Sequence, residues 1–496
     1  GMILALVFTG AALFYFSWVF KLVADWIRQY PLVKRLPGPK GLPVLGNVLD
    51  VAGDTTVPLK FFLEEANKAQ ARGEQTMTVC LLGRTITFPL NGQMTKVICD
   101  SMYEIMKGKD YGFLRDWIGE ANLLAIDEPW KKMRKFLTPM FHFTMLEGYL
   151  PRFNTHARLL VDVLGEERLK GKVDMAHFIK LSTLDAILDT TMGCHFSFVR
   201  NPEHPYLKAV DVFTYLSQKY NVEAHMWVNW IWMLLYHRQH KAALDQLHGL
   251  TDEVLHERFK AVESGEVDLR AKNRPLIDHF LVLHQDGQMT FDDIHYDINA
   301  VIFGGHDTTS ASIIFIFWSL ACQPDLQQKC YEEIMELFGG DRDRECEPED
   351  LKSLDYTERF IKESMRMFPP VPLIEREMRQ DFQMGEALLP RGTEIFINAF
   401  IIHHNETAWP DSWRFDPDRF LPEQMATRHT YDYIPFGAGI RNCLGQKFAM
   451  NQIKVIVCTL LRHYIFSTEH QLLDQGYATE VVLKPTLGCD LTVTPR

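Results

Sequence analysis

The chain has 496 residues, of which 47% are hydrophobic and 23% charged, so it can bury a large core and is not expected to be disordered. Length alone favours two or three domains, with one large helical domain as the alternative. The 52 Lys and Arg residues against 64 Asp and Glu residues give a net charge of -12 without a long basic run, which argues against a nucleic-acid partner.

Residues 2–20 form an uncharged, apolar run near the N-terminal end. As a helix, its 19 residues would span about 28 Å, close to the thickness of a bilayer core. No basic region precedes the run and no small-residue cleavage site ends it, whereas basic residues follow it at Lys21, Arg28, Lys34, Arg35 and Lys40. We therefore predict a transmembrane anchor over residues 1–21, with the rest of the chain on the cytoplasmic side. A cleaved signal peptide or a buried helix is the alternative.

A proline-rich and basic connector over residues 22–47 follows the anchor, because three prolines and three glycines within residues 35–47 forbid a continuous helix. Residues 48–496 contain no repeat or second linker, and we predict one catalytic domain there. Most of its segments have helical periodicity, and strand-like pieces occur at 76–89 and 393–398. The expected fold class is mainly α, with a small β-rich region.

One long helix is expected from Thr290 to residue 323, directly before Pro324. Thr290 with Asp293 three residues later resembles a capping box. The middle of this helix is unusual, because Gly304 and Gly305 precede a polar cluster that must find partners in a core.

The strongest chemical signal is the glycine-rich loop of residues 436–445, which places Cys443 at the start of a helical stretch. Gly437 and Gly445 would let the backbone approach a flat cofactor, and a helix N-terminus stabilises a thiolate. Arg441 supplies a cation for a carboxylate. The nine cysteines include no CxxC pair, which is typical of a reduced protein in which a single cysteine has a special role. An inert cysteine in a turn is the alternative, and the number of specified positions in ten residues argues against it.

The spacing of Phe436, Gly439, Arg441, Cys443 and Gly445 resembles the haem-binding signature of cytochromes P450. The resemblance extends over nearly the whole chain and implies the P450 fold, with Cys443 as the thiolate ligand of a haem b iron. It also implies that Glu363, Arg366 and Arg419 form a buried charge network under the cysteine loop. A solvated ion pair on a helix surface is the alternative for Glu363 and Arg366 alone.

The same resemblance assigns roles around the haem. It implies that Trp130, Arg134, Arg376 and Arg441 hold the propionates, with Phe436, Gly437 and Gly445 forming the loop against the cofactor. Core packing is the alternative for Trp130. Asp307 and Thr308 match the family's proton-relay pair.

Within the P450s, residues 134–143 and the segment Gly305–Thr309 are most similar to family 4, the fatty-acid and lipid terminal hydroxylases. Many members carry a haem-esterifying Glu where this chain has Gly304, so we expect a non-covalent haem. The segment before Trp130 also departs from the family, with Asp127 near a usual Gly. The expected reaction is monooxygenation, most consistent with terminal or near-terminal hydroxylation of long-chain fatty acids or related lipids. Sterols, other hydrophobic signalling molecules or xenobiotics are alternative substrates. Expected substrate contacts are Phe113, Leu114, Phe303, Gly304, Leu373, Ile374 and Leu487.

The resemblance further implies electrons from NADPH through a membrane-bound cytochrome P450 reductase, with cytochrome b5 as an optional second donor, at the endoplasmic reticulum membrane. Lys131, Lys132, Lys135 and Lys447 could dock an acidic donor, or simply be a solvated face. A non-catalytic membrane haem-binding protein is the rival from another class, and the Asp307–Thr308 pair argues against it. A zinc hydrolase is disfavoured because His256 and Glu257 lack a second His at the required spacing, and His403 with His404 is interpreted as a loop pair.

Overall fold

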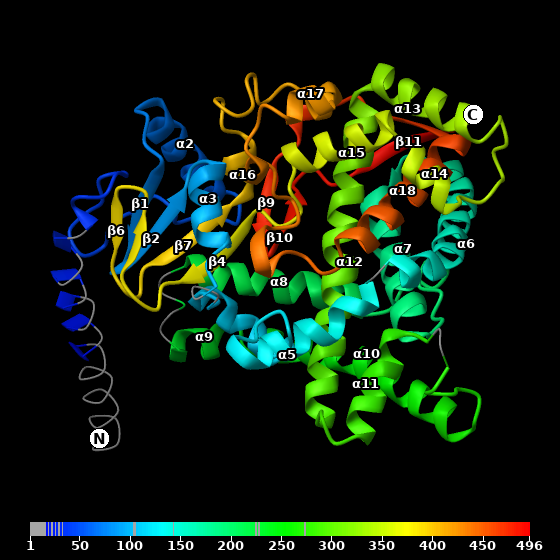
Figure 1. Ribbon diagram of the computed structural model, residues 1–496, viewed down its shortest axis with the longest axis horizontal. Coiled ribbons are helices and arrows are strands. Elements are labelled where there is room, and N and C mark those ends of the chain that lie inside the picture. Colours follow the sequence, from blue (N-terminus) through cyan, green and yellow to red (C-terminus); the bar gives the residue numbers. More distant parts are fainter. Residues whose placement is uncertain are drawn as a thin grey trace.

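The computed structural model describes residues 16–496 except 18, 21, 22, 25, 28, 29, 32, 103–105, 142, 224, 225, 227, 228, 272 and 273. Of the predicted anchor, residues 1–15, 18 and 21 therefore lie outside the described part. Helices form one large region, and most strands gather in a smaller region beside it (Figure 1). This is the predicted mainly α architecture with a small β-rich part.

The helices are α2 Val57–Ala71, α3 Gly92–Cys99, α4 Arg115–Ile118, α5 Asp127–Leu137, α6 Phe143–Glu167, α7 Met175–Ile187, α8 Tyr206–Val222, α9 Asn229–Leu235, α10 His237–Glu263, α11 Leu276–Gln285, α12 Phe291–Cys322, α13 Pro324–Leu337, α14 Pro348–Ser353, α15 Tyr356–Met367, α16 Ala399–His403, α17 Pro422–Met425 and α18 Gln446–His463. The strands are β1 Thr76–Leu81, β2 Arg84–Pro89, β3 Val173–Asp174, β4 Leu373–Glu377, β5 Phe382–Met384, β6 Ala387–Leu389, β7 Glu394–Asn398, β8 Tyr464–Ser467, β9 Tyr477–Glu480, β10 Val482–Pro485 and β11 Asp490–Pro495.

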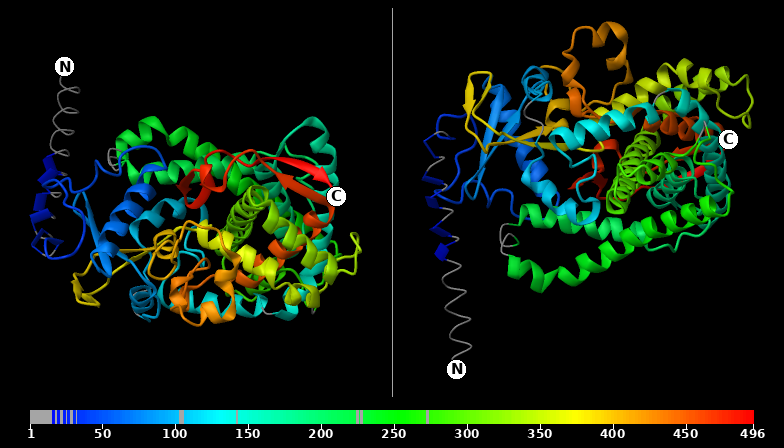
Figure 2. Two further views of the ribbon diagram at one scale, coloured as in Figure 1. Left: turned by 90° about the horizontal axis from the view of Figure 1, so that it is seen from above. Right: turned by 60° about the horizontal axis from the view of Figure 1, so that its bottom comes forward.

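The predicted long helix is α12, which runs through the helical region with other helices around it (Figure 2). The capping box is confirmed, because Thr290 Oγ1 accepts from the Asp293 N–H at 3.1 Å and Asp293 Oδ2 accepts from the Thr290 N–H at 2.9 Å. Among the described residues, α12 is the helix long and apolar enough to cross a membrane, but 72% of its most apolar window is buried within the fold.

Both glycines lie inside α12, and they differ in their surroundings. A Cβ on Gly305 would lie 2.4 Å from Ile187 Cδ1, at the end of α7, whereas a Cβ on Gly304 would meet nothing within 4 Å. Gly305 therefore permits close packing of α12 on α7, and Gly304 faces open space.

The main sheet has the strand order β1-β2-β7-β4. The hairpin of β1 and β2 occupies the predicted 76–89 segment, and β7 lies in the predicted 393–398 segment, parallel to β2 and antiparallel to β4. The smaller sheets β3-β11-β8, β9-β10 and β5-β6 were not predicted. Their strands have two to six residues, too few for a clear alternation, and β3, β8 and β11 pair across distant parts of the chain.

Candidate haem-thiolate site

The loop that carries Cys443 is fixed by its own backbone. The Cys443 N–H donates to the Phe436 carbonyl at 2.8 Å, and Gly437 and Gly439 have φ of 67° and 68°. A Cβ on Gly439 would lie 2.0 Å from the Cys99 carbonyl oxygen, so a larger residue would separate the loop from α3. Two residues after the cysteine, Gly445 is the N-cap of α18, as the sequence predicted for a helix N-terminus.

Cys443 is the only exposed cysteine of the nine, all of which lie in described parts of the chain. Nevertheless, burial by surrounding atoms raises the pKa of its thiol, while the Gly445 N–H and the Arg134 cation act to lower it. Arg134, on α5, donates to the Asn442 carbonyl at 2.8 Å and to Asn442 Oδ1 at 2.6 Å. The thiol thus lines an interior space, with donors and a cation arranged to favour its thiolate form.

Three basic side chains, Arg376, Arg441 and Lys107, lie beside this loop. Burial, together with the charge of Arg376, lowers the pKa of Arg441 to about 9, and burial with Arg376 and Arg441 lowers the pKa of Lys107 well below its usual value. Arg376, on β4, is 5% exposed and donates from Nη1 to its neighbour's carbonyl at 2.8 Å. The Arg441 guanidinium lies 4.6 Å from the ring centroid of Trp130 on α5. Such a crowded positive cluster is suited to bind carboxylates.

The predicted charge network is assembled and buried. Arg366 donates to both carboxylate oxygens of Glu363, at 2.7 and 2.8 Å, and neither side chain is exposed. Arg419 Nε lies 3.5 Å from Glu363 Oε1, and the guanidinium donates to the carbonyls of Pro410 and Asp411. The solvated-pair alternative is therefore wrong.

The histidine pair at 403 and 404, interpreted from the sequence as a loop pair, lies at the end of α16, whose last residue is His403 and whose C-cap is His404. His403 is fully buried. Its Nε2 accepts from the Ile434 N–H at 2.8 Å, so Nδ1 is the donor toward the Arg366 carbonyl at 3.2 Å. His403 thus connects the charge network to the residue two positions before Phe436.

On α12, the Thr308 hydroxyl donates to the Gly304 carbonyl at 2.8 Å. Asp307 is 2% exposed, and its Oδ2 has no hydrogen-bond partner among the described residues. It lies near the buried Tyr206, whose pKa is raised by burial and then by the Asp307 charge. The two predicted relay residues are neighbours in the chain, and the Asp307 carboxylate is buried whereas Thr308 is more accessible.

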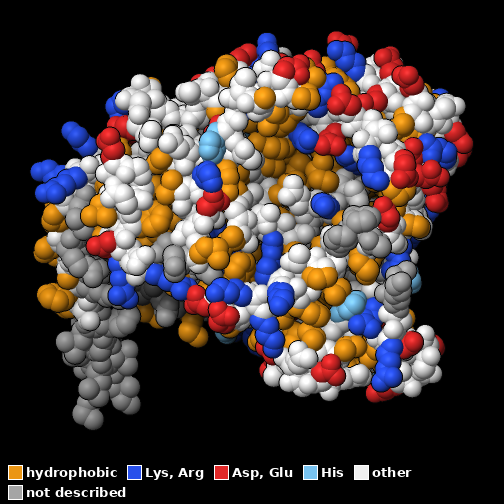
Figure 3. Space-filling view, in the orientation of Figure 1, with side chains coloured by type: hydrophobic (Ala, Val, Ile, Leu, Met, Phe, Trp, Pro, Cys, Tyr) orange, Lys and Arg blue, Asp and Glu red, His pale blue; other side chains and the backbone are white. Residues whose placement is uncertain are grey.

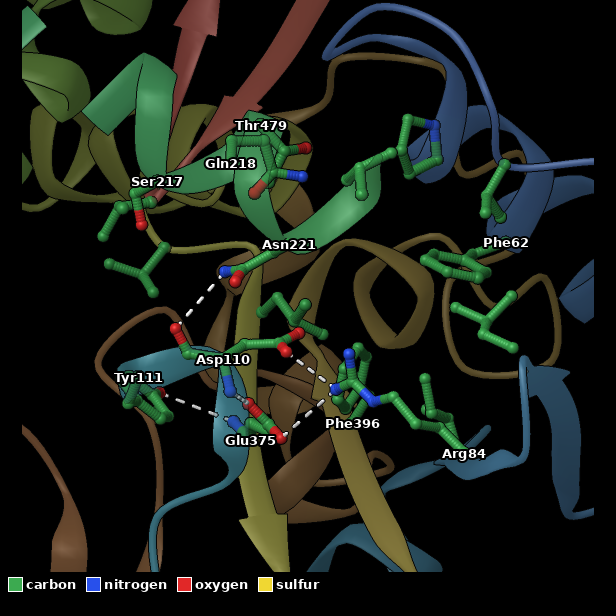
Figure 4. A pocket seen from close by; sticks show the side chains of 18 of the residues that line it. Phe62, Arg84, Asp110, Tyr111, Ser217, Gln218, Asn221, Glu375, Phe396 and Thr479 are labelled. Atoms are coloured by element: carbon green, nitrogen blue, oxygen red, sulfur yellow. Dashed lines mark hydrogen bonds and ion pairs between the residues drawn. The ribbon is translucent and has the colours of Figure 1, made fainter. Parts of the chain in front are cut away.

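The expected substrate contacts are dispersed. Leu114 and Leu373 line one cavity, shown in Figure 4, together with apolar residues of α2 and the main sheet. Phe113 packs in an aromatic cluster with Phe213 and Trp232, and Phe303 lies 4.6 Å from the Trp117 ring. Ile374 approaches Gly437, Gly304 is exposed on α12, and Leu487 is 49% exposed at the turn after β10.

The residues fit a haem. A cysteine thiol at a helix N-terminus lines an interior space, a cluster of basic side chains matches two carboxylates, and the half-buried Phe436 begins the cysteine loop. Gly304 and Thr308 provide an accessible stretch in the middle of α12, between the buried residues Phe303 and Thr309. Cys443 would bind the iron, and Arg376, Arg441, Lys107 and Trp130 would hold the propionates. Sequence reasoning missed Lys107, which gives no local signal in its irregular segment.

This combination of fold and site defines a haem-thiolate enzyme. A family model described as Cytochrome P450 matches residues 36–493, and the chain belongs to the cytochrome P450 family. It is similar to "Cytochrome P450 4c3" of Drosophila melanogaster, 30% identical over 95% of this chain and 91% of that protein. It is also similar to "Cytochrome P450 4V2" of Homo sapiens, 30% identical over 94% of this chain and 91% of that protein, and to "Cytochrome P450 4d2" of Drosophila melanogaster, 31% identical over 93% and 94%. The chain is a cytochrome P450 monooxygenase, and the predicted resemblance to family 4 is confirmed.

Proposed function

We infer that this monooxygenase hydroxylates long-chain fatty acids or related lipids at or near the chain end. The observation that carries the proposal is the cavity of Figure 4, whose walls are mostly apolar, from Phe62 on α2 to Leu373 at the start of β4. Arg376, one of the propionate candidates, lies three residues further along the same strand. Similarity to family 4 proteins supports the lipid class.

A thiolate-ligated haem supplies the activation of O₂. The chain's own contribution is to hold and supply protons: the Thr308 hydroxyl donates to the Gly304 carbonyl, and the neighbouring Asp307 is buried. Attack at a chain end needs a restricted approach, because a terminal C–H bond is stronger than its neighbour. We expect a mixture of terminal and adjacent products, since Gly304 offers no side chain to fix the haem. Thr308→Ala should divert electrons from product to hydrogen peroxide.

Electrons would come from NADPH through a membrane-bound reductase, with cytochrome b5 as an optional donor. Lys131, Lys132, Lys135 and Lys447 are exposed, and Figure 3 shows basic side chains gathered in the region of α5. Lys131 is paired with Glu128 at 2.7 Å. The remaining lysines support a docking face for an acidic protein, because they form a basic group on a chain whose net charge is -12.

We also propose that a single N-terminal segment anchors the protein in the endoplasmic reticulum membrane. The connector of residues 22–47 would join this anchor to a cytosolic catalytic domain. The exposed apolar residues of α9, Trp230, Met233, Leu234 and Leu235, support a second contact with lipid. Removal of residues 1–20 should weaken sedimentation with membranes without abolishing it and should leave the CO spectrum intact. Undiminished sedimentation of the truncated protein would contradict the anchor.

The deciding experiment is incubation of the reconstituted enzyme with a lipid panel and identification of the products by mass spectrometry. The panel contains fatty acids, their neutral derivatives, sterols and xenobiotics. Products at the chain end or the adjacent carbon support the proposal. Oxidation confined to sterol rings or mid-chain carbons would contradict it, while the monooxygenase activity would stand.

A further inference from the structure

The cavity of Figure 4 has an apolar wall and one charged corner. The apolar wall comes from α2, the main sheet and the turn before β10, and the neutral polar groups of Ser217, Gln218, Asn221 and Thr479 also line it. Among the described lining residues, the charged ones are Arg84, Asp110 and Glu375. This corner is the place where the polar end of a lipid would lie, since the rest of the cavity suits its chain.

Arg84 is already engaged by acidic partners. Its Nη2 lies 2.7 Å from Asp110 Oδ1, and its Nε donates to the two carboxylate oxygens of Glu394 at 3.2 and 3.1 Å. Glu394 is 1% exposed and also pairs with Lys109 at 3.1 Å. The corner thus contains three carboxyl groups around one guanidinium. Glu394, on β7, holds that guanidinium in place and does not itself line the cavity.

Glu375 is the member of this corner that lacks a full set of partners. Its side chain is 4% exposed, and Oε2 accepts from the Asp110 N–H at 3.2 Å. Oε1 lies 4.0 Å from Arg84 Nη2, beyond hydrogen-bond distance, and accepts no hydrogen bond among the described residues. Gly108 allows the carboxyl to lie here, because a Cβ on that residue would fall 1.8 Å from Glu375 Cδ. A buried carboxyl group that lines a cavity and has one oxygen without a hydrogen bond points to a ligand that hydrogen-bonds there.

The charge state of Glu375 follows from its neighbours. Burial raises its pKa to about 9, and the Asp110 and Glu394 charges contribute, while Arg84 opposes the rise. Glu375 is therefore a neutral carboxylic acid at neutral pH, able both to donate and to accept.

We propose that this corner recognises a lipid whose polar end is a neutral hydrogen-bonding group, above all a hydroxyl, and that it disfavours a free carboxylate. The inference rests on the proposed lipid hydroxylation and narrows its substrate class. A carboxylate would meet Asp110 without an uncommitted cation, whereas a hydroxyl can bond to Glu375 and to the Asn221 amide, which already donates to the Asp110 carbonyl at 3.3 Å. The natural ligand would be a long-chain alcohol rather than the corresponding acid.

The test compares ligands that share one alkyl chain and differ only in the head group. Equilibrium dialysis of the holoenzyme with the alcohol, the acid and the primary amine measures binding directly, and product analysis runs in parallel. We expect the alcohol to bind about tenfold tighter than the acid. Equal or tighter binding of the acid, or tighter binding of the amine, would overturn the inference.

Two variants locate the effect. Asp110→Asn should tighten acid binding about tenfold, because it removes the repelling charge, and should leave alcohol binding nearly unchanged. Glu64→Gln, which removes an exposed acid from α2 outside the cavity, should change neither. Acid binding that stays weak in a folded Asp110→Asn protein would contradict the proposed repulsion.

A pH series provides the second arm. Arg84, Asp110, Glu394 and Lys107 face Glu375, and ionisation of Glu375 above about pH 9 should weaken alcohol binding in the native protein. Glu375→Gln retains a neutral group and should bind the alcohol without that loss. Tight acid binding accompanied by chain-end products would overturn the head-group inference and leave the proposed function standing. Tight alcohol binding without oxidation of any lipid chain would support the head-group inference and contradict the proposed function.

Discussion

Arg134 of α5 donates two hydrogen bonds to Asn442, the residue immediately before Cys443. The loop carrying the thiol is therefore held from the side by a helix more than three hundred residues earlier in the chain. We expect Arg134→Ala to lower the fraction of reduced, CO-bound protein that shows the red-shifted Soret band, because the loop loses both its anchor and a cation.

Cys443→Ala should abolish that band completely. Lys135→Ala is the control for Arg134, as it alters an exposed cation at the next position of α5. If Cys443→Ala keeps the band, another residue must ligate the iron.

The lack of a carboxylate at Gly304 leads us to expect a non-covalently bound haem. Acid–organic extraction should therefore remove all the haem from the denatured chain. A Cβ at this position would meet nothing within 4 Å, so Gly304→Glu should fold and permit partial covalent attachment during turnover. If mass spectrometry finds haem still attached to the unsubstituted chain after extraction, the expectation is wrong.

The neighbouring glycines of α12 should respond oppositely to alanine. Gly304→Ala gains about 1 kcal/mol of helix propensity at no steric cost. Gly305→Ala places its Cβ against Ile187, which is 2% exposed, and overpacking costs about 1–3 kcal/mol. Urea unfolding should rank Gly304→Ala above Gly305→Ala in free energy of unfolding. In a double-mutant cycle, Ile187→Ala should cost less free energy of unfolding in the Gly305→Ala protein than in the unsubstituted protein, because it removes the atom that the new Cβ meets. Strict additivity of the two substitutions would rule out the contact.

The Glu363–Arg366 pair should be far more sensitive than a surface pair. Arg366→Ala leaves a buried carboxylate without its partner and should cost about 3–5 kcal/mol. Arg366→Lys should rescue little, because the two parallel bonds need the planar guanidinium. Haem content and thermal unfolding measure both effects. The matched control is Lys352→Ala, whose ion pair with Glu349 is exposed.

Acid should destabilise the protein partly through His403. Burial, with the Arg366 charge, lowers the pKa of His403 to about 3, whereas the unfolded chain titrates near 6.5. Between these values the unfolded state binds more protons, so the free energy of unfolding falls as the pH is lowered from about 6.5 to about 3, by up to about 1.4 kcal/mol per pH unit for this group.

His403→Gln should therefore show a shallower loss of stability in this window, even if it is less stable at pH 7. The exposed His237→Gln is the control. An unchanged pH slope in His403→Gln would exclude His403 as a contributor.

Several features of this protein follow from local sequence alone. The capping box fixes the start of α12, Pro324 follows its end, and the glycines of residues 436–445 with Cys443 determine a tight loop before α18. In each case the residues that interact are a few positions apart, so their spacing specifies the geometry.

Other features exist only in the folded protein. Arg84 meets Glu394 across 310 positions and Asp110 meets Glu375 across 265, and Lys107 joins Arg376 and Arg441 from a segment with no periodicity. No propensity or spacing encodes such contacts, because they depend on how the main sheet, α5 and the cysteine loop pack together. The sequence by itself predicted Cys443 as the thiolate ligand, the extent of α12 and the monooxygenase chemistry of the family. Tertiary packing decided which charges gather beside the cysteine loop and in the cavity of Figure 4, since burial and distance set the pKa values and the pairing of those groups.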